Sequence, residues 1–113
     1  MKPIAVTLGD PAGVGPEIVA RVVAESGDCL HGRRLRIYGP ASVFERALSA
    51  CGQPLSAVDR VDTGIDGPWH PGQPSAAGGR AALSAIEAAT AACLRGDCAA
   101  LVTAPISKTA LRM

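Results

Sequence analysis

Short apolar runs alternate with apolar stripes at helical spacing along this chain. The run Pro3–Leu8 is almost uninterrupted, which is typical of a strand buried in a parallel sheet. A stripe with a period near 3.6 residues follows it and predicts a helix that ends near Gly27. The members of that stripe are Ile18, Val19, Val22 and Val23.

The same alternation continues with a second strand over Leu35–Tyr38, closed by Gly39 and Pro40. Ser42-x-x-Glu45 then has the pattern of a capping box and predicts the start of a second helix. That helix ends before Gly52, and its expected apolar face consists of Val43, Ala47, Leu48 and Cys51. A short third strand is expected over Val58–Val61.

The segment Thr63–Gly79 is rich in Gly, Pro, Ser and Asp and has no periodicity, so it predicts a long loop. A third helix follows and stops at Gly96, and the strand Ala99–Thr103 ends before Pro105. The expected apolar face of the third helix consists of Leu83, Ile86, Thr90, Cys93 and Leu94. Strands that alternate with helices predict one α/β unit over residues 1–113, with an open, mostly parallel sheet flanked by helices.

Charge and composition narrow the classes of partner. The net charge is +1, and aromatic residues make up only 3% of the chain against 48% hydrophobic residues. The core must therefore be built from small aliphatic side chains. The sharpest basic cluster (Arg33, Arg34 and Arg36) is interleaved with Leu35 and Ile37 as in a strand, so we interpret it as a solvated strand edge. This pattern disfavours a nucleic-acid-binding surface.

Cysteine usage and hydropathy bear on the compartment. The four cysteines form no C-x-x-C pair, and Cys51 and Cys93 fall on apolar helix phases, where they resemble small core residues. We expect a reduced, cytoplasmic protein. The start of the sequence has no pattern of a signal peptide, and its apolar runs are too short to span a bilayer, so we expect no membrane association.

A glycine-rich turn joins the first strand to the first helix in the segment 9–17 (GDPAGVGPE). Its glycines allow a tight reversal and a close approach to a ligand, and Pro16 and Glu17 suit the first turn of a helix. The spacing differs from both the dinucleotide fingerprint and the P-loop. Asp10 either contacts a ligand or binds the backbone of its own turn, and the sequence leaves both open.

The segment after the last strand is the second candidate. Lys108 could pair with a phosphate or carboxylate, or it could simply be solvated. Thr103 and Ser107 could bind a ligand, or cap the short helix expected over Thr109–Leu111. His31 and His70 lie in polar loops without acidic or cysteine partners at ligand spacing, so no metal site is predicted within the chain.

Segment 9–17 and segment 99–108 (AALVTAPISK) resemble two signatures of the 4-hydroxythreonine-4-phosphate dehydrogenase family. The resemblance implies a fold of the isocitrate and isopropylmalate dehydrogenase type. It also implies an NAD-dependent oxidation, with decarboxylation, of 4-phosphooxy-L-threonine in pyridoxal 5'-phosphate biosynthesis, by a homodimer that uses a divalent metal. Carried onto this chain, it implies cofactor binding by Asp10, Gly13 and Gly15 and substrate binding by Lys108 and Thr103.

Members of that family are much longer, and their metal ligands lie beyond the matched stretch. We therefore expect this chain to be the N-terminal portion of a two-domain dehydrogenase, inactive alone and prone to self-association through exposed apolar surface. Related dehydrogenases act on phosphorylated four-carbon acid sugars or on dihydrodiols of aromatic acids, and both remain alternatives. A non-catalytic module that binds an anion or nucleotide at the glycine turn is a third.

Overall fold

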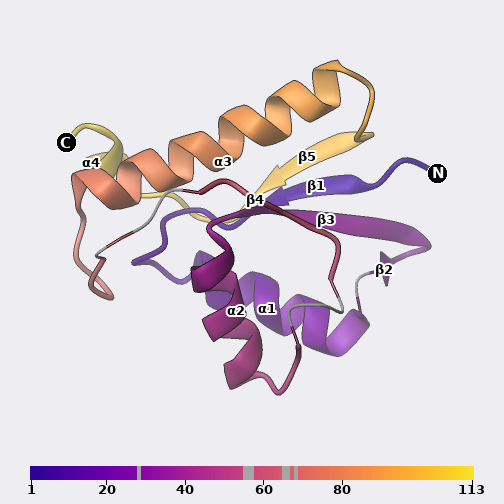
Figure 1. Cartoon of the computed structure of the whole chain (residues 1–113), viewed down its shortest axis with the longest axis horizontal. Helices are drawn as coiled ribbons and strands as arrows, with labels where there is room; N and C mark the ends of the chain where they lie inside the picture. The colour runs from indigo at the N-terminus through magenta and orange to yellow at the C-terminus, as the bar shows by residue number, and fades with distance from the viewer. Residues whose placement is uncertain (28, 55–57, 65–66, 68) are drawn as a thin grey trace.

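The computed structural model describes residues 1–27, 29–54, 58–64, 67 and 69–113. Its centre is a sheet in which β1 (Ile4–Thr7) runs parallel to β3 (Arg33–Gly39) on one side and to β5 (Ala100–Thr103) on the other. The parallel strands all end at the same edge of the sheet, on the side of α4 in Figure 1. The loops that follow β1 and β5 are thereby brought together.

The outer edge of β3 is shared by two short strands. β2 (Cys29–Leu30) is antiparallel to its beginning, and β4 (Arg60–Asp62) is parallel to its end. The strand predicted over Val58–Val61 corresponds to β4, which lies slightly later in the chain. Val58 is instead a buried core residue just before the strand.

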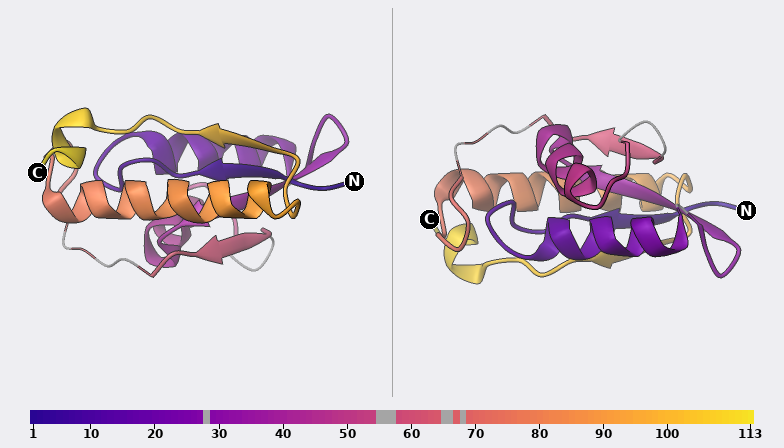
Figure 2. Two further views of the ribbon diagram at one scale, coloured as in Figure 1. Left: turned by 90° about the horizontal axis from the view of Figure 1, so that it is seen from above. Right: turned by 90° about the horizontal axis from the view of Figure 1, so that it is seen from below.

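Helices cover both faces of the sheet. α1 (Gly15–Ser26) and α2 (Ala41–Ala50) lie on one face, and α3 (Ala76–Leu94) crosses the other, as the two views of Figure 2 show. The short α4 (Lys108–Leu111) packs beside the start of α3. The predicted fold class, an open and mostly parallel α/β sheet flanked by helices, is confirmed. None of the described helices has the length and apolar character needed to cross a membrane.

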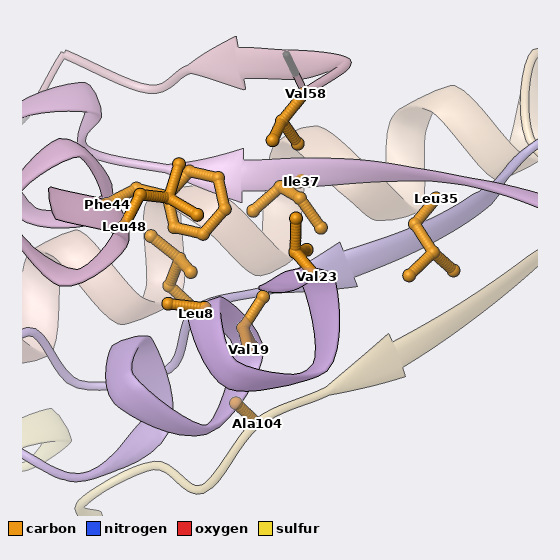
Figure 3. Packing of buried hydrophobic residues seen from close by; sticks show 10 residues of the cluster. Leu8, Val19, Val23, Leu35, Ile37, Phe44, Leu48, Val58 and Ala104 are labelled. Carbon is orange, nitrogen blue, oxygen red and sulfur yellow. The ribbon is translucent and has the colours of Figure 1, made fainter. Parts of the chain in front are cut away.

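The larger core lies between the sheet and the α1–α2 layer (Figure 3). Phe44 is 2% exposed and Leu48 fully buried, and both reach from α2 toward Leu8 and Ile37 of the sheet. Of the stripe expected on α1, Val19 and Val23 are buried, whereas Ile18 and Val22 are 45% and 36% exposed. Ile18 and Val22 instead line a groove between α1 and β5, together with Val102 and Thr103.

The smaller core lies under α3, and here the predicted apolar face is only partly right: Cys93 packs against this core and Ile86 is half-buried, but the two leucines are not buried. Leu83 and Leu94 are 46% and 84% exposed. The buried residues of this helix are mainly alanines, of which Ala85, Ala89 and Ala92 pack in the core with Ala5 and Tyr38 of the sheet. Small side chains let the helix axis come close to strands that already carry Tyr38 on this face. Shape complementarity has therefore outweighed the larger transfer energy of leucine.

Two predicted boundaries also differ. The N-cap of α2 is Pro40, so Ser42 lies inside the helix and forms no capping box. The carboxylate of Asp62 accepts the free Ala41 N–H at 3.1 Å in its place. The loop expected to extend to Gly79 ends at Ser75, whose side chain caps α3 by accepting from Gly78 N–H at 3.0 Å.

The arginines of β3 make local contacts. Arg36 Nε donates to the carboxylate of Asp59 at 3.0 Å, and this hydrogen bond raises the pKa of Arg36. Arg33 donates to the carbonyl oxygen of Lys2 at 3.3 Å. These contacts agree with their interpretation as residues of a strand edge.

Candidate functional site

A cavity of about 310 Å³ opens at the carboxyl edge of the parallel strands. Open α/β sheets place their ligand sites at this edge. Three segments far apart in sequence form its walls: the loop after β1, the loop before α3 and the segment after β5. They contribute Asp10, Ala12, Gly13 and Val14, then Gly72, Gln73 and Pro74, then Pro105, Ile106 and Ser107.

Backbone hydrogen bonds join the three walls. The Asp10 N–H donates to the carbonyl of Pro105 at 3.3 Å, and the Gly72 N–H donates to the carbonyl of Ala12 at 2.7 Å. The glycine loop is therefore the middle wall, bonded to the other two. Displacement of this loop would change the shape of the whole cavity.

The glycines of the loop have different tasks. Gly9 has a φ of 76°, and a Cβ at this position would overlap the carbonyl oxygen of Pro105. Gly15 is buried, and a Cβ there would overlap the carbonyl oxygen of Leu8 and lie 3.1 Å from the Cβ of Ala104. Only Gly13 lines the cavity, and a Cβ on it would have no contact shorter than 3.4 Å.

Asp10 is 4% exposed, and its Oδ1 accepts the N–H of Ala12 at 2.8 Å. The structure thus contains the local turn-stabilising bond that the sequence left as one of two alternatives. Asp10 also lines the cavity. A contact between Asp10 and a cofactor remains a prediction.

The two residues predicted to bind substrate lie outside the cavity. Lys108 is exposed at the start of α4. Thr103 is exposed at the end of β5 and stands in register with Thr7 on β1. The Thr7 hydroxyl is buried and has no hydrogen-bond partner among the described residues. Ser107 lines the cavity and also caps α4, where its Oγ accepts from Ala110 N–H at 3.1 Å.

One wall was missed as a site by sequence reasoning. Gly72–Pro74 belongs to the long loop before α3, whose length and Gly/Pro content indicated a function but not a place. The bond from Gly72 to Ala12 holds it at the sheet edge. A Gly/Pro loop without periodicity carries no signal for such a contact.

A metal does not fit the described part of the chain. It contains no group of three or more His, Cys, Asp or Glu side chains that could hold one ion. His31 and His70 are exposed in separate loops. The four cysteines (Cys29, Cys51, Cys93 and Cys98) are free thiols, and Cys98 is buried against the Tyr38 hydroxyl at 3.6 Å.

Comparisons with known proteins agree with this geometry. The chain is 37% identical to the 4-hydroxythreonine-4-phosphate dehydrogenase of Zymomonas mobilis, over 98% of this chain and 36% of that protein. It is 34% identical to the D-threonate 4-phosphate dehydrogenase of Salmonella typhimurium, over 99% of this chain and 39% of that protein. A crystal structure of a 4-hydroxythreonine-4-phosphate dehydrogenase from Burkholderia phymatum superposes with a TM-score of 0.86 at 30% identity, covering 99% of this chain and 39% of that one.

The chain thus spans little more than a third of the length of the relatives it matches. Their fold is of the isocitrate and isopropylmalate dehydrogenase type, as expected from the two signatures. The model of the family described as "Pyridoxal phosphate biosynthetic protein PdxA" matches residues 19–113, which include the third cavity wall and the whole of α3. This chain belongs to the PdxA family of pyridoxal phosphate biosynthetic proteins.

Proposed function

We propose that this chain forms the cofactor-binding edge of an NAD-dependent dehydrogenase that oxidises and decarboxylates 4-phosphooxy-L-threonine for pyridoxal 5'-phosphate biosynthesis. The observation that carries the proposal is the cavity between the glycine loop and the segment after β5, in a chain of this family. The relatives named for this reaction are much longer. The complete activity is therefore proposed for a protein of their length.

The glycine loop suits a cofactor because backbone, rather than side chains, faces the cavity at Gly13. A volume of about 310 Å³ is near the lower end of ligand pockets, roughly 300–1,000 Å³. It would hold one half of a dinucleotide, with the rest outside. NAD supplies the hydride acceptor when bound. The role of this loop is to orient NAD through Asp10 and Gly13, while Gly15 lets α1 pack closely against the end of β1.

Lys108 and Thr103 are proposed to receive the substrate. Both flank the segment Pro105–Ser107, which forms one cavity wall. A bound substrate that extends from the cavity on that side would therefore contact them. The exposed ammonium of Lys108 can pair with a phosphate as a point charge. The hydroxyl of Thr103 can donate to a phosphate or accept from a substrate hydroxyl.

The metal that the family implies is not assigned to this chain, because the described residues offer no ligand set. We further propose that the protein acts in the cytoplasm as a homodimer. Its free thiols suit a reducing compartment, and the exposed apolar residues Val102 on β5 and Ile18 and Val22 on α1 suit a packing partner.

A second substrate deserves the same assay. One relative is named D-threonate 4-phosphate dehydrogenase, and the identity to it is 34%, close to the 37% of the first relative. D-threonate 4-phosphate is also a phosphorylated four-carbon hydroxy acid, but it carries a hydroxyl in place of the amino group. The same phosphate and secondary alcohol would therefore meet Lys108 and the cofactor.

The test is turnover by the complete reading frame, followed as NADH formation with each of the two substrates and a divalent metal. Lys108→Ala should raise KM for the phosphorylated substrate by about tenfold or more, because a charge-assisted hydrogen bond is lost. Lys108→Arg keeps the positive charge and should raise KM less. Lys2→Ala is the matched control, since Lys2 lies before β1 at the opposite edge of the sheet. Turnover with neither substrate, or an equal effect of Lys108→Ala and Lys2→Ala, would overturn the proposal.

A further inference from the structure

The carboxylate of Asp10 meets the beginning of α3. A Cβ placed on Gly78 would lie 2.9 Å from Oδ1 of Asp10 and 3.5 Å from its Cγ. The first contact is shorter than carbon and oxygen tolerate, and Asp10 is short, buried and already bonded to Ala12. The carboxylate therefore fits only because residue 78 has no side chain.

Helix propensity alone would not favour glycine at position 78. A glycine inside a helix costs stability relative to alanine, and α3 has two in succession, Gly78 and Gly79. Each faces a different neighbour: Gly78 faces Asp10, and a Cβ on Gly79 would overlap the carbonyl oxygen of Ala110. The pair therefore lets two separate segments approach the first turn of α3.

The position of Asp10 beside the first turn of α3 also suits the negative charge of its carboxylate. The first turn of a helix carries the positive end of its dipole, which favours a nearby carboxylate. Ser75 already accepts the N–H of Gly78. The contact of Asp10 with this turn is therefore electrostatic and steric, while its hydrogen bond goes to Ala12.

All three cavity walls connect through Asp10. Its main chain bonds to Pro105 and to Gly13, its side chain bonds to Ala12, and Ala12 in turn accepts from Gly72. We propose that Asp10 is a positioning residue that fixes the glycine loop against the first turn of α3 and so sets the shape of the cavity. Its contribution to NAD binding rests on the function proposed above, whereas its hold on the loop does not.

Amide hydrogen exchange, measured by NMR on the 113-residue chain without ligand, tests the hold on the loop. Asp10→Ala should speed exchange at Ala12 and Gly72 by about tenfold, as loss of one hydrogen bond changes a local opening equilibrium. Asp10→Asn should restore slow exchange, since the amide oxygen can accept the same bond. Amides in β1 and β3 should not change.

Gly78→Ala should reproduce the faster exchange at Ala12 although Asp10 is intact, because the new methyl displaces the carboxylate. Gly79→Ala is the matched control: it should affect the amides of α4 and the amide of Met113, which donates to the Ala110 carbonyl, and leave Ala12 unchanged. Unchanged exchange at Ala12 in either Asp10→Ala or Gly78→Ala overturns the proposal. Loss of protection at every amide in both variants also overturns it, because Asp10 would then act on global stability.

NAD⁺ titration of the same variants addresses the site. Asp10→Ala and Gly78→Ala should weaken binding, and Asp10→Asn should stay within about threefold of the parent, since it keeps the hydrogen bond that shapes the loop. Weak binding by Asp10→Asn with normal exchange at Ala12 would show that the charge of Asp10 acts on the cofactor directly, and would overturn the link between loop position and NAD⁺ binding while the hold of Asp10 on the loop stands. If no variant and no parent chain binds NAD⁺, the proposed function fails for this chain while the exchange result stands.

Discussion

Gly13 and Gly15 are two residues apart in one loop, yet the structure predicts opposite outcomes for the same substitution. At Gly15 a methyl would overlap the Leu8 carbonyl oxygen, a backbone atom at the end of β1 that cannot rotate away. At Gly13 the nearest atom would be the Asp10 carbonyl oxygen at 3.4 Å, which is an ordinary contact. Gly15→Ala should therefore damage the fold, and Gly13→Ala should damage only the cavity.

The magnitude at Gly15 follows from two opposing terms. Replacing a helical glycine by alanine gains up to about 1 kcal/mol in helix propensity. Overpacking at a contact that only backbone movement can relieve costs about 3 kcal/mol or more, because α1 must move away from β1 and loosen Val19 and Val23 in the larger core. The expected net loss is about 2–3 kcal/mol, a large share of the roughly 5–15 kcal/mol by which such domains are stable.

Urea unfolding monitored by far-UV circular dichroism measures this loss. With an m-value of about 1.5 kcal/mol/M, the midpoint of Gly15→Ala should fall by about 1.5 M, and that of Gly13→Ala should stay within about 0.5 M. Gly13→Ala should instead weaken NAD⁺ binding, because its methyl enters the cavity. A midpoint for Gly15→Ala equal to that of the parent would refute the reasoning, as would equal losses in the two variants.

Three further predictions concern the cores and the open edge. Burial in the smaller core, and then the hydrogen bond with Cys98, raises the pKa of Tyr38 above its ordinary value of 10.0. The stability that this tyrosine contributes is therefore complete below pH 10 and is lost as pH rises through the folded-state pKa. Urea midpoints at rising alkaline pH should fall less steeply in Tyr38→Phe than in the parent, and identical slopes would contradict this. Val102 on β5 is 54% exposed beside Ile18 and Val22, so the chain should self-associate with rising concentration in analytical ultracentrifugation. Val102→Lys should reduce this self-association, whereas Leu94→Lys, at a site 84% exposed at the end of α3, should leave it unchanged. Phe44→Ala should lower the free energy of unfolding by about 3–5 kcal/mol, since its ring is 2% exposed in the larger core, and a loss below about 1 kcal/mol would contradict the packing described.

The order of strands and helices could be predicted because it depends on local periodicity. Pro3–Leu8 and Leu35–Tyr38 have the unbroken apolar character of buried parallel strands, and the structure places β1 and β3 there. The stop of α1 at Ser26 follows from the glycine after it, which has a φ of 70°. Such signals lie within a few residues of the element that they define, so no knowledge of the neighbours is needed.

The buried face of α3 could not be predicted in this way. Both the leucine phase and the alanine phase of the helix are apolar, and the larger side chains favour the wrong one. The choice depends on the sheet, where Tyr38 occupies the space that leucines would need. The start of α3 was likewise hidden, because Gly78 and Gly79 are poor helix formers that pack against Asp10 and Ala110.

The sequence by itself determined that a glycine turn and a lysine segment follow two parallel strands, and hence that both lie at one edge of the sheet. Only the tertiary structure decided that Asp10 and Gly13 share a cavity with the loop around Gly72, that Gly15 serves the contact between α1 and β1, and that Lys108 stands outside. The physical reason is distance along the chain. Spacing within a motif sets local geometry, but the walls of this cavity come from segments about sixty and ninety residues beyond the turn, and their approach depends on which backbones can come close.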